Sequence, residues 1–95
     1  MSKLTQPVFI LIHGAWHGGW VWQTVAKTLR QQGYTVYTPT LTGLGERSHL
    51  LNDTITLDTF ISDIINLIKW ENLDNIILLG HSFGGTVITG VAEKI

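Results

Sequence analysis

Three short apolar runs alternate with stretches of helical periodicity along the chain. The runs at residues 8–12, 34–38 and 75–79 are rich in β-branched, aliphatic or aromatic side chains, which predicts three strands. After each run, apolar residues recur at i, i+3 and i+4 spacing, which predicts three helices. The helical positions are Val21, Trp22, Val25, Ala26 and Leu29, then Leu57, Phe60, Ile61, Ile64, Ile65 and Ile68, then Val87, Ile88, Val91 and Ile95.

This β-α-β-α-β-α order is typical of an α/β fold with three layers, in which helices cover both faces of a parallel sheet. The continuous apolar character of the runs indicates strands that are buried on both faces. Gly33 is expected to stop the first helix, and Thr56 is expected to cap the start of the second. Residues 40–53 lack a clean period and are predicted to form a long functional loop.

Composition narrows the class of protein further. The chain has 95 residues, 44% of them hydrophobic, with a net charge of −1 and no cysteine. Such a chain forms one small domain, and it is too apolar to be a disordered tail. The charge argues against nucleic-acid binding, and the absence of cysteine excludes disulfides and thiolate metal sites. No apolar run is long enough for a bilayer span or a signal peptide, so we expect a soluble, cytoplasmic protein without membrane partners.

A possible nucleophile lies where the third strand meets the third helix. Residues 80–84 read Gly-His-Ser-Phe-Gly, which fits the G-x-S-x-G pattern of a nucleophile elbow. A strand that turns sharply into a helix strains the backbone at the serine, and glycines two residues away prevent clashes. This context predicts Ser82 as a nucleophile and the backbone N–H of Phe83 as an oxyanion donor. The alternative is a glycine-rich turn with an incidental serine.

The stretch HGAWHGGW at residues 13–20 follows the first strand and is the natural source of a second oxyanion donor. Gly14 is expected to let the backbone turn so that the N–H of Ala15 faces the same point as that of Phe83. Both loops must then reach one oxyanion, which predicts the strand order 2-1-3. His13 and His17 lack the glutamate of a metalloprotease helix and are interpreted as structural or pocket-lining. His81 is interpreted as a buried packing residue rather than a base.

Two nucleotide-binding patterns fit the sequence poorly. Gly80, Gly85 and Thr86 match part of a phosphate-binding loop, but its lysine is missing. Residues 43–48 match part of a dinucleotide fingerprint, yet Ser48 replaces the third glycine. Glu46 and Arg47 are interpreted as a surface charge pair. We therefore expect no nucleotide, flavin or metal cofactor.

Taken together, the stretches 9–22, 38–48 and 77–85 resemble the N-terminal part of the α/β-hydrolase superfamily. Within it, the chain is similar to the branch of plant methyl esterases, salicylate-binding esterases and hydroxynitrile lyases with their bacterial relatives. The resemblance covers nearly the whole chain and implies an ester hydrolase with Ser82 as nucleophile. It also implies that Trp16, Trp20 or Leu41 lines or supports the acyl pocket, with Gly14 and His81 near the substrate. The lyases carry a threonine where this chain has Gly14, which favours the esterase side.

The family's acid and base residues have no counterpart here. Its triad runs Ser, Asp, His along the chain, but no Asp or His follows Ser82. Residues 1–95 are therefore interpreted as the N-terminal portion of one hydrolase domain, truncated and inactive alone, whose whole form acts on a small carboxylic ester. The alternative is a non-catalytic module that binds a small molecule or another protein. In either case the free edge of the third strand is expected to favour self-association.

Overall fold

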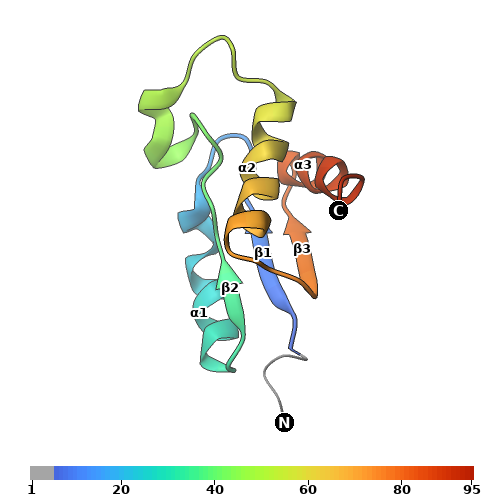
Figure 1. Cartoon of the computed structure of the whole chain (residues 1–95). Coiled ribbons are helices and arrows are strands. Elements are labelled where there is room, and N and C mark those ends of the chain that lie inside the picture. The colour runs from blue at the N-terminus through green and yellow to red at the C-terminus, as the bar shows by residue number, and fades with distance from the viewer. Residues whose placement is uncertain (1–5) are drawn as a thin grey trace.

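The computed structural model describes residues 6–95, which form a three-stranded parallel sheet flanked by three α-helices (Figure 1). Two 3₁₀ helices, at Gly19–Trp22 and Gly45–Leu50, lie in the connections. In chain order the main elements are β1 (Val8–Ile12), α1 (Gln23–Gln31), β2 (Thr35–Tyr37), α2 (Leu57–Trp70), β3 (Ile76–Gly80) and α3 (Phe83–Ala92). The alternation expected from the hydrophobic pattern is confirmed, and the strand bounds differ from the expected ones by at most one residue. Helix α3 begins four residues before Val87 and ends at Ala92, so Ile95 lies outside the helix in which it was expected.

The strands lie in the order β2-β1-β3, as the sequence predicted. Val8 of β1 is aligned with Thr35 of β2 and with Ile76 of β3, and both pairings are parallel. The pairing of β1 with β3 runs on to Ile12 and Gly80. Consequently the carboxyl-terminal ends of β1 and β3 lie at the same end of the sheet, and the two predicted oxyanion loops begin there (Figure 1).

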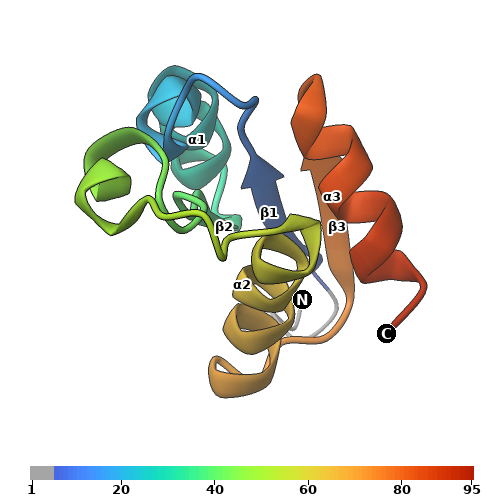
Figure 2. The same ribbon diagram turned by 90° about the horizontal axis from the view of Figure 1, so that it is seen from above.

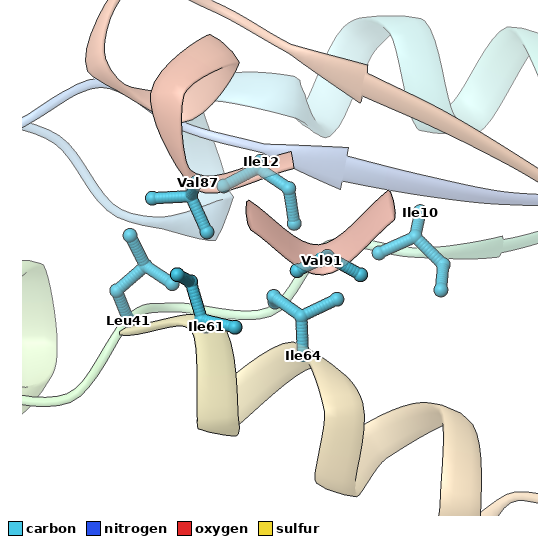
Figure 3. Packing of buried hydrophobic residues seen from close by; sticks show 7 residues of the cluster. All are labelled: Ile10, Ile12, Leu41, Ile61, Ile64, Val87 and Val91. Carbon is cyan, nitrogen blue, oxygen red and sulfur yellow. The ribbon is translucent and has the colours of Figure 1, made fainter. Parts of the chain in front are cut away.

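Alternate residues of β1 face two separate hydrophobic clusters. Ile10 and Ile12 point toward α2 and α3, where they pack with Leu41, Ile61, Ile64, Val87 and Val91 (Figure 3). On the other face, Leu11 packs with Ala26 of α1 and Val36 of β2. Figure 2 shows α1 and the pair α2 and α3 on different sides of β1. The three-layer arrangement predicted from the sequence is therefore present around the central strand.

Strand β3 departs from the prediction of burial on both faces. Ile76 and Leu78 pack against the cluster of α2 and α3, whereas Ile77 and Leu79 are 42% and 46% exposed. The parallel register places Ile77 and Leu79 on the α1 side of the sheet. Helix α1 packs on β2 and β1 and leaves this side of β3 uncovered within residues 6–95.

The connection from β2 to α2 is more ordered than the predicted loop, because it contains the 3₁₀ helix Gly45–Leu50. At the start of α2, Thr56 is the N-cap residue, and its backbone N–H donates to the Thr59 hydroxyl at 3.0 Å. Gly33 ends α1 with a φ of 91°, a conformation that favours glycine. Both helix boundaries inferred from the sequence are thus confirmed. In the described part of the chain, no helix combines the length and hydrophobicity needed to cross a membrane.

Candidate active site

Ser82 occupies the turn between β3 and α3 and has a strained backbone. Its φ of 56° and ψ of −119° lie where residues other than glycine are rarely found. The side chain is exposed and makes no capping hydrogen bond to α3. The backbone N–H of His81 still donates to the Ile12 carbonyl at 3.0 Å, so β1 holds the chain up to the residue before Ser82. The sequence prediction of a sharp, strained turn at this serine is confirmed.

The flanking glycines are required by close backbone approach. A Cβ at Gly80 would lie 2.5 Å from the carbonyl carbon and oxygen of Gly84. A Cβ at Gly84 would collide with the carbonyl oxygen of Ile12 on β1. Gly85, in contrast, has open space around its Cβ position. The packing of the first turn of α3 against β3 and β1 therefore depends on Gly80 and Gly84 but not on Gly85.

The loop after β1 lies against the elbow. A Cβ placed on Gly14 would be 3.6 Å from the Cβ of Ser82 and 3.5 Å from Nδ1 of His81, which is ordinary van der Waals contact. The expectation that Gly14 is needed for a turn is wrong, because its φ is not positive and other residues can adopt its backbone conformation. What glycine provides here is free space beside Ser82, and a larger side chain would fill it.

The two predicted oxyanion donors belong to the start of α3 and to the loop after β1. Phe83 is the first residue of α3, and Ala15 lies in the exposed turn after β1, where the His17 N–H donates to the Gly14 carbonyl at 3.2 Å. Among residues 6–95, neither the Ala15 N–H nor the Phe83 N–H forms a backbone hydrogen bond. The Phe83 ring packs edge-to-face on Phe60 of α2, with 5.6 Å between centroids. This contact anchors the first turn of α3.

His13 is a structural residue at the end of β1. It is fully buried, its Nε2 accepts the Leu41 N–H at 3.0 Å, and its Nδ1 lies 2.6 Å from the Gly14 carbonyl oxygen. These partners require a neutral ring with its proton on Nδ1. Burial lowers the pKa of His13, which favours that neutral form, although the Gly14 carbonyl opposes the shift. His13 therefore ties β1 to the loop that follows β2.

His17 and His81 line a pocket of about 260 Å³ together with Val21, Trp22 and Val25. The centroids of the two imidazole rings lie 6.5 Å apart. The indole Nε1 of Trp22 is buried and has no hydrogen-bond partner among the described residues. The interpretation of His81 as a buried packing residue is wrong, because the side chain is exposed. The sharp turn directs it away from the core and toward the pocket.

The remaining predicted pocket residues lie elsewhere. Trp16 is 92% exposed in the turn after β1, and Trp20 is about half exposed beside His17. Leu41 is fully buried between β1 and α2, so it can support the site but offers no surface to a ligand. Within residues 6–95, no group of three His, Asp or Glu side chains is placed to hold a metal ion.

Thr40 and Glu46 form a polar cluster that sequence reasoning missed. The Thr40 hydroxyl donates to Glu46 Oε2 at 2.6 Å and accepts the Gly19 N–H at 2.8 Å. Arg47 Nη1 donates to the Thr40 carbonyl at 2.9 Å. The interpretation of Glu46 and Arg47 as a surface charge pair is therefore incomplete, since both bind Thr40. The hydrogen bond from Thr40 lowers the pKa of Glu46, and its own backbone N–H adds to this effect.

Comparison with known proteins identifies this architecture. A family model described as the alpha/beta hydrolase family matches residues 9–95. The chain belongs to the alpha/beta hydrolase family. The matched region contains the strained serine turn, both glycine-rich loops and the Thr40 cluster. The resemblance inferred from the three sequence stretches is confirmed.

The relatives of this hydrolase chain include several esterases. It is 54% identical over 87 residues to the carbendazim hydrolyzing esterase of Nocardioides sp. (strain SG-4G), covering 92% of this chain and 36% of that protein. It is 35% identical over 96 residues to putative methylesterase 14, chloroplastic, of Arabidopsis thaliana, covering 98% of this chain and 27% of the relative. The chain thus spans about a third of the length of these relatives.

A solved structure with a similar fold is the extracellular alpha/beta-hydrolase from a Paenibacillus species. That protein is described as sharing structural and functional homology with Tobacco Salicylic Acid Binding Protein 2. The TM-score is 0.84 at 39% identity, over 95% of this chain and 36% of the other. Polyneuridine aldehyde esterase superimposes with a TM-score of 0.82 at 26% identity, over 95% of this chain and 36% of that one. Esterases thus recur among the relatives found by sequence and by structure.

Proposed function

We propose that this chain supplies the nucleophile and the oxyanion donors of a serine hydrolase for small carboxylic esters. The observation that carries the proposal is the strained, exposed Ser82 between β3 and α3, which faces Gly14 of the loop after β1. Strain of this kind is kept at functional sites, where the surrounding structure holds it in place. The esterases among the relatives support an ester as the substrate class.

In the proposed reaction, Ser82 Oγ attacks the ester carbonyl carbon and gives up its proton to a base. The carbonyl oxygen becomes an oxyanion that accepts hydrogen bonds from the N–H groups of Ala15 and Phe83. Collapse of this intermediate breaks the ester C–O bond, the base returns its proton to the departing alcohol, and an acyl group remains on Ser82. Water then attacks the acyl carbon, which releases the carboxylic acid and restores the Ser82 hydroxyl. The N-terminus of α3 adds a favourable partial positive charge near the oxyanion.

The base is the missing component among residues 6–95. His13 is buried and hydrogen-bonded to Leu41 and Gly14. Among residues 6–95, no histidine forms a hydrogen bond with Ser82 Oγ. A serine hydroxyl without a base in hydrogen-bond reach is a poor nucleophile at neutral pH. We therefore propose that the whole enzyme provides its base and orienting acid from residues outside this sequence, and that the 95-residue chain is inactive alone.

A second candidate is binding without catalysis. The pocket beside His81 and the unpartnered Trp22 indole N–H could accept a small molecule with a hydrogen-bond acceptor. Ligand binding requires no catalytic base, so the residues of the 95-residue chain would be sufficient for it. It predicts saturable ligand binding that does not depend on the Ser82 hydroxyl.

Hydrolysis of p-nitrophenyl acetate separates these possibilities. The isolated chain should match its Ser82→Ala variant, whereas a full-length enzyme that contains this sequence should lose at least about 10³-fold in kcat on the same substitution. Ser82-dependent turnover by the purified 95-residue chain would show that one of its own histidines acts as the base. A full-length enzyme that is indifferent to Ser82→Ala would overturn the serine mechanism.

A further inference from the structure

We propose that Glu46, acting through Thr40, is a positioning residue for the loop that carries the Ala15 N–H. The proposal rests on the function proposed above, because it gives the Ala15 N–H a purpose. Glu46 is exposed and lies in the connection between β2 and α2, whereas Ala15 lies in the loop after β1. The link between them is a directed chain of hydrogen bonds that crosses from one loop to the other.

The direction of that chain is fixed by the chemistry of the Thr40 hydroxyl. A hydroxyl has one proton, and here it is donated to Glu46 Oε2 at 2.6 Å. The lone pairs of the same oxygen then face the Gly19 N–H, which donates at 2.8 Å. Because a carboxylate is a strong acceptor, it polarises the hydroxyl and strengthens its hold on Gly19. Thr40 is only 7% exposed, so water has little access to compete.

Close backbone packing makes this hydrogen bond decisive for the loop. A Cβ on Gly19 would collide with the Thr38 carbonyl oxygen, and a Cβ on Gly45 would lie 3.0 Å from the Cα of Gly18. The loop after β1 thus lies directly on the backbone that carries Thr40 and Glu46. The turn from Gly14 to His17, closed by a 3.2 Å hydrogen bond, connects the clamped segment to Ala15.

An oxyanion donor contributes only if its position is held to within about 0.5 Å. Among residues 6–95, Glu46 forms no hydrogen bond with Ser82 or Ala15, so its effect must pass through the geometry of the loop. Loss of the clamp should therefore loosen residues 15–19 while the sheet and its two hydrophobic clusters remain intact. In an active enzyme the same loss should lower kcat and leave KM unchanged, because the donor is needed in the transition state.

Backbone dynamics of the 95-residue chain test the proposal without any turnover. In Thr40→Val and Glu46→Ala, the Gly19 amide should exchange with solvent at least tenfold faster, and the Ala15 order parameter should fall from about 0.85 to below 0.6. Thr40→Ser keeps the hydroxyl and should restore the parent values. Asp53→Ala removes another exposed carboxylate and is the matched control. Glu46→Ala alters only an exposed side chain, so it still tests the proposal if Thr40→Val fails to fold.

An Ala15 order parameter that stays high in Glu46→Ala would overturn the proposal, as would an equal loss in Asp53→Ala. Faster exchange throughout β1 would point to a merely structural role and would also overturn it. These outcomes do not depend on hydrolysis, so the failure of the proposed function is distinguishable from the failure of the clamp. In a full-length enzyme with Ser82-dependent activity, a kcat unchanged by Glu46→Ala would count against the clamp alone.

Discussion

At the scale of single residues, Ser82 and His13 adopt locally unfavourable states that the surrounding structure stabilises. Ser82 keeps a left-handed φ that costs of order 1–3 kcal/mol, and the hydrogen bond from His81 to Ile12 together with the first turn of α3 holds it there. His13 buries an imidazole completely but satisfies both of its nitrogens. The sequence motif predicted the first feature, since G-x-S-x-G describes local chain geometry. It could not predict the partners of His13, because Leu41 is 28 residues away.

The buried His13 should make folding stability depend on pH. Its pKa is lowered in the folded state, so the unfolded chain takes up a proton more readily than the folded protein as pH falls through about 6.5. The free energy of unfolding should therefore stay level above pH 7 and fall between pH 6.5 and 5.5, by at most about 1.4 kcal/mol per pH unit. Urea unfolding at pH 7.5, 6.5 and 5.5 measures this slope.

The matched control for this pH effect is His49→Gln, which replaces an exposed imidazole and should leave the slope unchanged. Should the slope disappear in His49→Gln, the effect would belong to His49. A folded protein in which the His13 ring already titrates above pH 6.5, followed by NMR, would contradict the prediction directly.

At the scale of elements, glycines decide how closely α3 approaches the sheet. The sequence placed Gly80, Gly84 and Gly85 in one elbow motif, and only the structure separates their roles. Gly80 and Gly84 face backbone across the turn, whereas Gly85 faces open space on the exterior of α3. Sequence spacing predicts which residues a sharp turn needs, but it cannot reveal which glycine faces another chain segment.

This difference predicts opposite outcomes for two alanine substitutions in the same helix. Gly84→Ala should destabilise the fold by about 2 kcal/mol or more, because its Cβ meets the Ile12 carbonyl oxygen and α3 must move away from β1. Gly85→Ala should stabilise it by about 0.5–1 kcal/mol, because alanine is the better helix former and nothing obstructs its methyl group. Urea denaturation of both variants measures the difference, and two destabilised variants of equal size would refute the assignment.

The hydrogen bonds of Thr40 could not be predicted from the sequence, because they depend on the packing of segments that are far apart in the chain. Hydrophobic periodicity locates strands and helices, because each element presents one face to a core. A hydrogen bond between Thr40 and Gly19 joins two irregular segments 21 residues apart, and no periodicity records it. Glu46 and Arg47 could be read only as exposed charges, since their common partner is determined by the tertiary fold.

At the scale of the whole molecule, one side of the sheet remains open in the described chain. Ile77 and Leu79 of β3 and Val21 and Val25 near the start of α1 are all more than a third exposed. The outer edge of β3 carries no lysine or proline, which natural edge strands use to discourage pairing. The sequence predicted a free edge on the third strand, and the strand order β2-β1-β3 places β3 at the edge. An exposed apolar helix face was also expected from the sequence, but the exposure of Ile77 and Leu79 on one face of the strand itself was not.

This edge should make the 95-residue chain associate with a second copy of itself. Two β3 strands can pair antiparallel about a two-fold axis, which brings Ile77 and Leu79 of both copies onto one shared face. Sedimentation velocity should show concentration-dependent dimers or larger species between about 5 and 200 μM. Leu79→Lys places a charge at the pairing edge and should return the chain to monomer, whereas Leu51→Lys, at an exposed leucine in the connection before α2, should not. A parent chain that stays monomeric over this range, or one that Leu51→Lys disrupts equally, would show that the β3 edge does not drive association.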